Sequence, residues 1–395
     1  VSAVQTAEGA LTEVHSMLQR MNELATQSAN GTNSNTDRKA IQDEIDQLTT
    51  EIDRVSETTK FNETYLLKGD GAEKAHNVNA HDAGLDGVTL TDKGDTVDVT
   101  LKTLNAGDKV SIAGKNYTIG ATAADAQKIV DAQKVDGKTV TVNGTTYTYK
   151  TNQWTNADGS AATVGGGAAG SITIKGGDVV SDGTKTLTAM KDGADAAGAD
   201  GIDDNDSTVI TAGKAYQLQT AEIVKASSIG TDTAAAVKNG ANADKDATAT
   251  FTLNKGTVSY KDALSFNLHV GADADMTNKI TVNIDSMNSA GLGVKGIKAD
   301  TEQDATYAID AIADAISTVS SQRSSLGAVQ NRLEHTINNL DNVVENTTSA
   351  ESRIRDTDMA EEMVNYSKNN ILAQAGQSML AQANQSNQGV LSLLQ

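Results

Sequence analysis

Apolar residues at the start of the chain recur at alternating steps of three and four. This first stripe contains Val4, Ala7, Leu11, Val14, Leu18, Met21 and Ala25. Such spacing is typical of a heptad repeat, in which one side of a helix packs against a partner helix. After the polar loop 30–35, a second stripe contains Ile41, Ile45, Leu48, Ile52 and Val55. We therefore expect residues 1–58 to form an antiparallel helical hairpin.

A third stripe lies far along the chain and keeps the same spacing. It contains Ala305, Ile309, Ile312, Ile316, Val319, Leu326, Leu333, Ile337, Leu340 and Val344. The pattern predicts a helix from about 302 to 347, roughly 70 Å long at 1.5 Å per residue. A helix of this length needs a partner, and the hairpin 1–58 is the expected one. Arg323 and Gln330 fall on stripe positions, where we expect polar layers that fix the register.

The middle of the chain, from about 70 to 262, has a different composition, rich in Gly, Asp, Thr and Ala. Residues 110–119 and 140–149 read as β-hairpins, the second with an Asn-Gly turn. A short helix is expected between them at 123–133, and a loop or linker at 155–170. A further hairpin is expected at 264–284. The sequence thus predicts an α+β protein: a long antiparallel, coiled-coil-like helical rod with a β-rich insertion of one or two outer domains.

Composition narrows the functions that such a chain can have. It has 395 residues and a formal charge of −20, which disfavours nucleic acid and anionic membranes as partners. The chain has no run of about 18 apolar residues, so the sequence predicts no transmembrane span. The absence of Cys excludes disulfides and thiol catalysis, and the absence of Pro suits a chain that folds after delivery in an unfolded state. Because the first stripe is already running at Val4 and no Met precedes it, we expect Val1 to be a cut within a helix.

Candidate catalytic and metal-binding residues are few. His76 and His81 stand five residues apart, and Asp203, Asp204 and Asp206 form an acidic cluster that could supply oxygen ligands to calcium. The cluster lacks the bidentate Glu of an EF-hand loop, and the chain has no HExxH, G-x-S-x-G or Walker motif. We expect solvated loops at both places, with no catalytic residue, metal or cofactor. The chain is therefore predicted not to be an enzyme.

Both ends of the chain resemble bacterial flagellin. The resemblance rests on residues 1–31, VSAVQTAEGALTEVHSMLQRMNELATQSANG, and on IQDEIDQLTTEIDRVSETTKFN at 41–62. Near the other end it rests on SSLGAVQNRLEHTINNLDN, TSAESRIRDTDMAEEMVNYSKNNILAQAG and MLAQANQSNQGVLSLLQ. It covers about 1–65 and 263–395, and the middle is similar only in kind to the variable outer region of the family. The family's first segment, some tens of residues ahead of Val1, is absent from this sequence.

The resemblance implies four regions and a set of partners. Residues 1–70 would be the N-terminal half of the rod, 71–262 the variable outer region of probably two lobes, 263–355 the hairpin and the C-terminal half of the rod, and 356–395 the C-terminal helix of an inner tube. The protein would be an extracellular filament subunit for motility, exported unfolded by the flagellar type III route. Its partners would be other copies, an export chaperone and the filament cap. Two alternatives stay open: a hook–filament junction protein, and a filament subunit whose outer lobes act as an adhesin.

The resemblance also implies a role for the stretch LQRMNELATQSANG at 18–31. In flagellins the corresponding helix face contacts a neighbouring protofilament and, in the free monomer, the host's Toll-like receptor 5. The matching positions are Arg20, Leu24 and Glu44, with Gln19 and Glu23 beside them. We expect charge-assisted hydrogen bonds from Arg20 and Glu44 and an apolar anchor from an exposed Leu24. The alternative is that Leu24 only broadens the core of the hairpin and that the charges are solvated.

Overall fold

The computed structural model describes the chain apart from residues 1, 194–197, 241, 272–277 and 394–395. The chain divides into two compact units. The first contains Val1–Phe266 and Asn283–Leu326, and the second contains Asn267–Val282 and Gly327–Gln395. Helical N- and C-terminal regions flank a β-rich insertion, which confirms the α+β class. The four-region division expected from the sequence stays a prediction.

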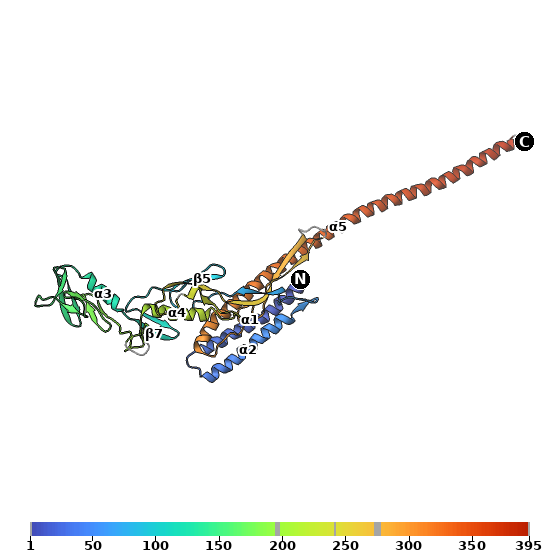
Figure 1. The fold of residues 1–395 in the computed structure, drawn as a ribbon. Coiled ribbons are helices and arrows are strands. Elements are labelled where there is room, and N and C mark those ends of the chain that lie inside the picture. The colour runs from blue at the N-terminus through green and yellow to red at the C-terminus, as the bar shows by residue number, and fades with distance from the viewer. Residues whose placement is uncertain (1, 194–197, 241, 272–277, 394–395) are drawn as a thin grey trace. The chain divides into compact units, whose positions relative to one another are not determined.

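Two helices form the predicted hairpin at the start of the first unit. Helix α1 spans Ser2–Ser28 and α2 spans Asn35–Thr58, and they lie side by side in opposite directions (Figure 1). Every residue of the first stripe is buried. In the second stripe Ile41, Ile45 and Ile52 are buried, whereas Leu48 and Val55 are half-buried. A capping box of Ser34 and Asp37 begins α2, which satisfies backbone N–H groups that the helix itself leaves free.

The segment before the long C-terminal helix is tied to this hairpin by buried hydrogen bonds. Ser28 Oγ donates to the carbonyl oxygen of Ala299 at 2.5 Å. Gln42 accepts from the backbone N–H of Ala299 at 2.6 Å and donates to the carbonyl oxygen of Ile297 at 3.0 Å. Polar side chains of both helices thus satisfy backbone groups of a turn-rich segment that would otherwise be buried without partners.

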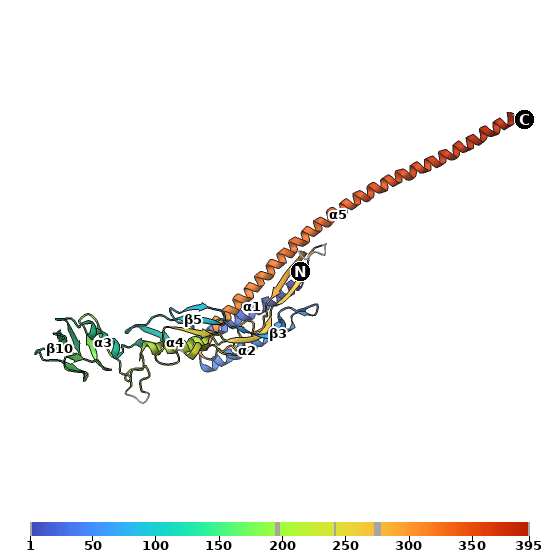
Figure 2. The ribbon, with the colours of Figure 1, turned by 45° about the horizontal axis from the view of Figure 1, so that its top comes forward.

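Helix α5 spans Glu302–Leu393 and is one unbroken helix, shown in Figure 2. It contains the predicted helix 302–347 and continues beyond it to Leu393. The third stripe is buried at Ala305, Ile312, Val319, Leu326 and Leu333. Its last part is exposed, however: Ile337 is 44% and Val344 is 61% exposed. Within the described residues, no helix is both long enough and apolar enough to cross a membrane.

The first lobe of the insertion is built around a sheet core that contains Val97, Val99, Ile119, Ile210 and Leu253. One sheet has the order β16 (Ala236–Val237), β17 (Thr250–Asn254), β5 (Thr96–Thr100) and β4 (Thr89–Asp92). A second has the order β15 (Val209–Ile210), β7 (Lys115–Ile119) and β6 (Lys109–Ile112). Helix α4 (Ala212–Ala226) packs on this core through Ala215, Tyr216 and Ile223, and a short 3₁₀ helix spans Lys238–Gly240.

The second lobe has its own core, centred on Trp154 and containing Ile129, Val140, Val142 and Val180. Its sheet has the order β10 (Gln153–Thr155), β9 (Thr145–Lys150), β8 (Thr139–Val142), β13 (Val179–Ser181) and β14 (Thr186–Thr188). Helix α3 spans Ala123–Ala132, as predicted, and packs on this core. The hairpin β8–β9 turns at Asn143 and Gly144, both with positive φ, as an Asn-Gly turn requires. The expected loop 155–170 also contains β11 (Thr163–Val164), which pairs with β12 (Ser171–Ile172).

Three two-stranded ribbons complete the sheet structure. Strand β1 (Lys60–Phe61) pairs with β2 (Thr64–Tyr65), and β3 (Asp70–Asn77) pairs with β18 (Thr257–Asp262). Strand β19 (Leu264–His269) pairs with β20 (Lys279–Ile284), as the sequence predicts for 264–284. Residues 272–277, which lie between these two strands in the sequence, are outside the described residues.

Candidate protein–protein interfaces

A polar cluster on the helical hairpin contains most of the residues expected to form an interface. We call Gln19, Arg20, Glu23 and Glu44 the Arg20 cluster. Arg20 Nε donates to Glu44 Oε1 at 2.8 Å, and Nη1 donates to Glu23 Oε2 at 3.4 Å. The Arg20 side chain is 50% exposed, and Gln19 is exposed beside it. The hydrogen bond and charge of Glu44 raise the pKa of Arg20, so the cluster always presents a guanidinium.

Leu24 does not lie on this exposed surface. Its side chain is only 2% exposed, so the expectation of an exposed Leu24 is wrong. On α1 it lies three residues from Met21 and next to Ala25, both of which are fully buried. The buried face of α1 is therefore wider than the alternating stripe, because an apolar residue beside an a or d position also turns toward the core. The position of Leu24 next to the stripe residue Ala25 was the sequence feature that could have indicated its burial.

The polar residues expected within the third stripe have different surroundings. Arg323 Nη2 donates to Glu8 Oε1 of α1 at 3.1 Å, while its Nε is buried without a hydrogen-bond partner. Gln330 Nε2 donates to Glu334 Oε1, one turn further along the same helix. The polar layers themselves stay a prediction. Gln322, which the sequence reading passed over, is 7% exposed and bonds to the backbone of Asn283 and Asp285.

The C-terminal part of α5 exposes many large apolar side chains. They are Val343, Val344, Ile354, Met359, Met363, Val364, Tyr366, Ile371, Leu372, Met379, Leu380, Val390, Leu391 and Leu393. We call these the α5 apolar set. An exposed apolar surface of this size on one helix is typical of an interaction site. Helices also gain most of their stability from packing, so this segment needs a partner.

The candidate metal ligands of the insertion make hydrogen bonds and ring contacts within the protein. Asp203 accepts hydrogen bonds from the backbone N–H groups of Lys191, Asn205 and Asp206. His76 lies in β3 and stacks on Tyr260, while His81 is largely buried, so the expectation of one solvated His loop is wrong. Within the described parts of the chain, no group of three or more His, Cys, Asp or Glu is arranged to hold a metal ion.

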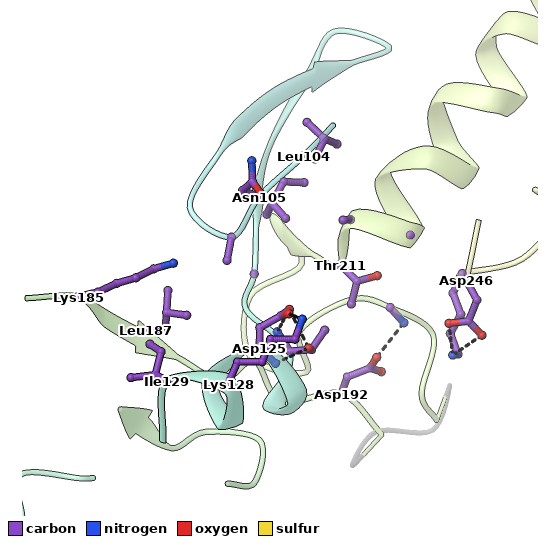
Figure 3. Close-up of a pocket in the computed structure, with 18 of the residues that line it drawn as sticks. Leu104, Asn105, Asp125, Lys128, Ile129, Lys185, Leu187, Asp192, Thr211 and Asp246 are labelled. Carbon is purple, nitrogen blue, oxygen red and sulfur yellow. Dashed lines mark hydrogen bonds and ion pairs between the residues drawn. The ribbon is translucent and has the colours of Figure 1, made fainter. Parts of the chain in front are cut away.

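Trp154, the single tryptophan of the chain, is not available at the surface for stacking on a sugar. Trp154 is 1% exposed and makes an edge-on contact with Tyr149, with ring centroids 5.1 Å apart. A cleft of about 670 Å³ lies between the cores of the two lobes, lined by Leu104, Ile129, Leu187 and several charged side chains (Figure 3). Its Lys128 and Lys245 already pair with Asp125 and Asp246.

Family models match both helical regions of the chain. Residues 1–72 match the bacterial flagellin N-terminal helical region, and residues 309–394 match the bacterial flagellin C-terminal helical region. A flagellin of Clostridium tyrobutyricum is 38% identical over 394 residues, which cover 98% of this chain and 82% of that protein. The chain belongs to the bacterial flagellin family. A flagellin of Salmonella typhimurium strain LT2 is 35% identical over 445 residues, which cover 100% of this chain and 86% of that protein.

Membership of the flagellin family makes the chain a structural filament subunit and not an enzyme. Copies of the chain therefore polymerise into a filament. Among solved structures, FliC from Burkholderia pseudomallei is similar, with 16% sequence identity and a TM-score of 0.31. That similarity covers 84% of this chain and 98% of the other.

Proposed function

We propose that this flagellin uses the Arg20 cluster twice: for contact with a neighbouring copy in the filament, and for recognition of the free monomer by Toll-like receptor 5. The observation that carries the proposal is the exposed guanidinium of Arg20, which two carboxylates hold in place on the packed helical hairpin. Arg side chains with fixed geometry are frequent centres of protein–protein contacts. Family membership also supports the proposal, because residues 18–31 resemble the flagellin helix face that contacts a neighbouring protofilament and Toll-like receptor 5.

The geometry leaves Arg20 donors available for a partner. Glu44 engages Nε and Glu23 engages Nη1, whereas Nη2 has no partner among the described residues. A partner's carbonyl or carboxylate could approach this free side of the guanidinium. The two glutamates reduce the side-chain entropy that Arg20 would lose on binding. Leu24 is buried in the hairpin and so is not available for direct contact with a partner.

The test compares Arg20→Ala with Arg54→Ala. Arg54 is a matched control because it is also exposed on the hairpin and pairs with Glu51 three residues away. On cells that express Toll-like receptor 5, we expect Arg20→Ala to weaken signalling by the monomer at least about tenfold. Its melting temperature should equal that of the unchanged chain, because the side chain contributes little to the core. Arg54→Ala should signal as the unchanged chain does.

The same variants test the filament contact. Arg20→Ala should raise the protein concentration needed for assembly, measured by sedimentation and electron microscopy, whereas Arg54→Ala should not. If both variants match the unchanged chain in signalling and in assembly, the Arg20 cluster is ordinary solvated surface and the proposal is wrong.

We further propose that the chain leaves the cell unfolded by the flagellar type III route and that an export chaperone and the filament cap act on it on the way to the extracellular filament. The absence of Cys and Pro supports this route, because neither disulfides nor slow prolyl isomerisation would delay folding after export. The α5 apolar set is the surface that a chaperone would have to cover before assembly. Replacing Ile371 and Leu372 by Asp should abolish chaperone binding in a pull-down. Secretion that persists in cells without the flagellar export apparatus would contradict the route.

A further inference from the structure

The chain contains three Asn-Gly pairs, at 30–31, 143–144 and 239–240. Asparagine is one of the chemically labile side chains of proteins. It is lost when the backbone nitrogen of the next residue attacks the side-chain carbonyl carbon, Cγ. Glycine in that next position favours the attack, because it has no side chain to obstruct a close approach. By sequence the three pairs are alike, so their surroundings in the folded chain decide which of them can react.

Asn143, in the turn between β8 and β9, is held at both ends of its side-chain amide. Its Nδ2 donates to Asp178 Oδ1 at 2.8 Å, and its Oδ1 accepts from the backbone N–H of Val179 at 2.8 Å. The backbone N–H of Asn143 also donates to the carbonyl oxygen of Val179 at 2.9 Å. Both side-chain hydrogen bonds must break before Cγ can turn toward the nitrogen of Gly144, so the fold protects this pair.

Asn30, in the loop between α1 and α2, is fixed through its side chain and its backbone. Its Oδ1 accepts from the backbone N–H of Thr32 at 3.1 Å and from the Thr32 hydroxyl at 3.0 Å. Its carbonyl oxygen accepts from Arg38 Nη2 at 3.1 Å, and the Arg38 side chain is itself buried and donates to the carbonyl oxygen of Ser28. The loop conformation at this second pair is therefore also held by hydrogen bonds.

Asn239 differs from both, because nothing in the described parts of the chain hydrogen-bonds to its side-chain amide. It is exposed and lies in the 3₁₀ turn Lys238–Gly240, directly after the edge strand β16. Its φ is 61°, a conformation that few residues with a side chain adopt. No atom beyond the chain neighbours of Gly240 lies within 4 Å of the position that a Cβ would take there. The amide can therefore rotate toward the nitrogen of Gly240 without losing a hydrogen bond or meeting an obstacle.

We propose that Asn239 is a site of spontaneous deamidation in the folded protein. The backbone nitrogen of Gly240 attacks Cγ of Asn239 and releases its proton to solvent, while the Cγ–Nδ2 bond breaks and the amide nitrogen leaves as ammonia. Water then opens the resulting succinimide ring at either of its two carbonyl carbons. One opening gives aspartate, and the other gives isoaspartate, in which the chain continues through the side-chain carbonyl. One water molecule is consumed and one ammonia is released, with no oxidation or reduction.

The modification would change the first lobe as the protein ages. Each conversion adds one negative charge beside Lys238, in a chain whose formal charge is already −20. The isoaspartate product also lengthens the backbone directly after β16, a strand of two residues at the edge of its sheet. Copies of different age in one filament would then differ in surface charge. The proposal is independent of the Arg20 cluster.

Incubation of the full chain in warm, mildly alkaline buffer, followed by peptide mapping with mass spectrometry, tests the proposal. In the folded chain Asn239 should convert at least about tenfold faster than Asn30 or Asn143, because side-chain hydrogen bonds retard only those two. In guanidinium chloride, with unfolding checked by circular dichroism, the three rates should agree within about threefold, because these hydrogen bonds are lost. Chromatography of the 239 peptide should separate two products, isoaspartate and aspartate.

Asn239→Gln is the matched variant, because its longer side chain closes a ring on the next nitrogen far less readily. It should abolish conversion at 239 and leave the rates at Asn30 and Asn143 as they are in the unchanged chain. The proposal is wrong if Asn239 stays intact in the folded chain while it converts in guanidinium chloride. It is also wrong if the three pairs convert equally fast in the folded chain, or if aspartate is the sole product at 239.

Discussion

At the scale of single residues, Arg20 and Leu24 lie about one turn apart on α1 and differ in burial. Arg20 is exposed, whereas Leu24 is buried in the hairpin. Leu24→Ala should lower the free energy of unfolding by about 2–5 kcal/mol, because it removes buried contacts and leaves a cavity. Urea unfolding followed by circular dichroism would measure this, with Arg20→Ala as a control of unchanged stability. A Leu24→Ala variant as stable as the control would show that Leu24 does not belong to the core.

The capping box at the start of α2 makes a second prediction at this scale. Asp37 accepts hydrogen bonds from the Ser34 hydroxyl at 2.7 Å and from the Ser34 backbone N–H at 3.2 Å, and these bonds lower the pKa of its carboxyl. A carboxyl with a lowered pKa stabilises the folded state above its unfolded pKa of about 3.9, and this contribution is lost as the pH falls through the folded value. Asp37→Ala should therefore reduce stability at pH 7, and its deficit should shrink as the pH falls below about 4.

Ser34→Ala gives the complementary measurement. It removes the hydroxyl that lowers the pKa of Asp37, so its deficit at pH 7 should also shrink over the same acidic range. Urea unfolding between pH 2 and pH 7 would compare both variants with the unchanged chain. If the loss of stability in each variant stays constant between pH 2 and pH 7, the capping box has no role in the acid sensitivity of the chain.

At the scale of elements, the third stripe on α5 is buried in one part and exposed in another. Leu333 is 4% exposed, whereas Val344 lies on the same stripe with 61% of its surface exposed. Leu333→Ala should cost about 2–5 kcal/mol in the free chain, and Val344→Ala should change its stability by less than about 0.5 kcal/mol. Chemical denaturation of dilute protein would distinguish the two. Equal effects of both substitutions would mean that the stripe is covered along its whole length before assembly.

The second lobe gives a prediction at the scale of the whole molecule. Its core around Trp154 contains no residue of the first lobe's core. The chain enters and leaves the lobe at neighbouring positions, because Ala121 and Ala189 form a β-bridge. Replacing residues 122–188 by a short Gly-Ser linker should leave the remaining protein folded and able to form filaments. The linker would join two adjacent positions, Ala121 and Ala189, so closing it costs little conformational entropy.

The excised lobe is the matching control. Residues 121–190, expressed alone, should give a cooperative melting transition and a near-ultraviolet signal from buried Trp154. Electron microscopy of the shortened chain would show whether filaments still form. Failure to form filaments, despite a folded remainder, would mean that the second lobe takes part in assembly.

The sequence by itself determined the elements and the family of this protein. Every residue of the first stripe is buried in the structure, because apolar residues at heptad spacing lie on one side of a helix and that side packs against a partner. The hairpins at 110–119 and 140–149 and the helix at 123–132 follow from turn residues and a capping Thr that act over a few positions. Long quoted stretches at both ends were specific enough to indicate flagellin. These are all local signals that need no knowledge of distant contacts.

Tertiary structure alone decided which of several adjacent side chains are buried and which remain available. Leu24 looked exposed beside a narrow stripe, yet the buried face of α1 includes it. Arg323 falls on the third stripe by spacing and Gln322 does not, but packing shows that Gln322 is buried and bonds to the backbone of Asn283 and Asp285. The rings of His76 in β3 and Tyr260 in β18 stack on each other although the two strands lie far apart along the chain. Such a pairing depends on long-range contacts that no local periodicity encodes, because the residues meet only when the whole chain folds.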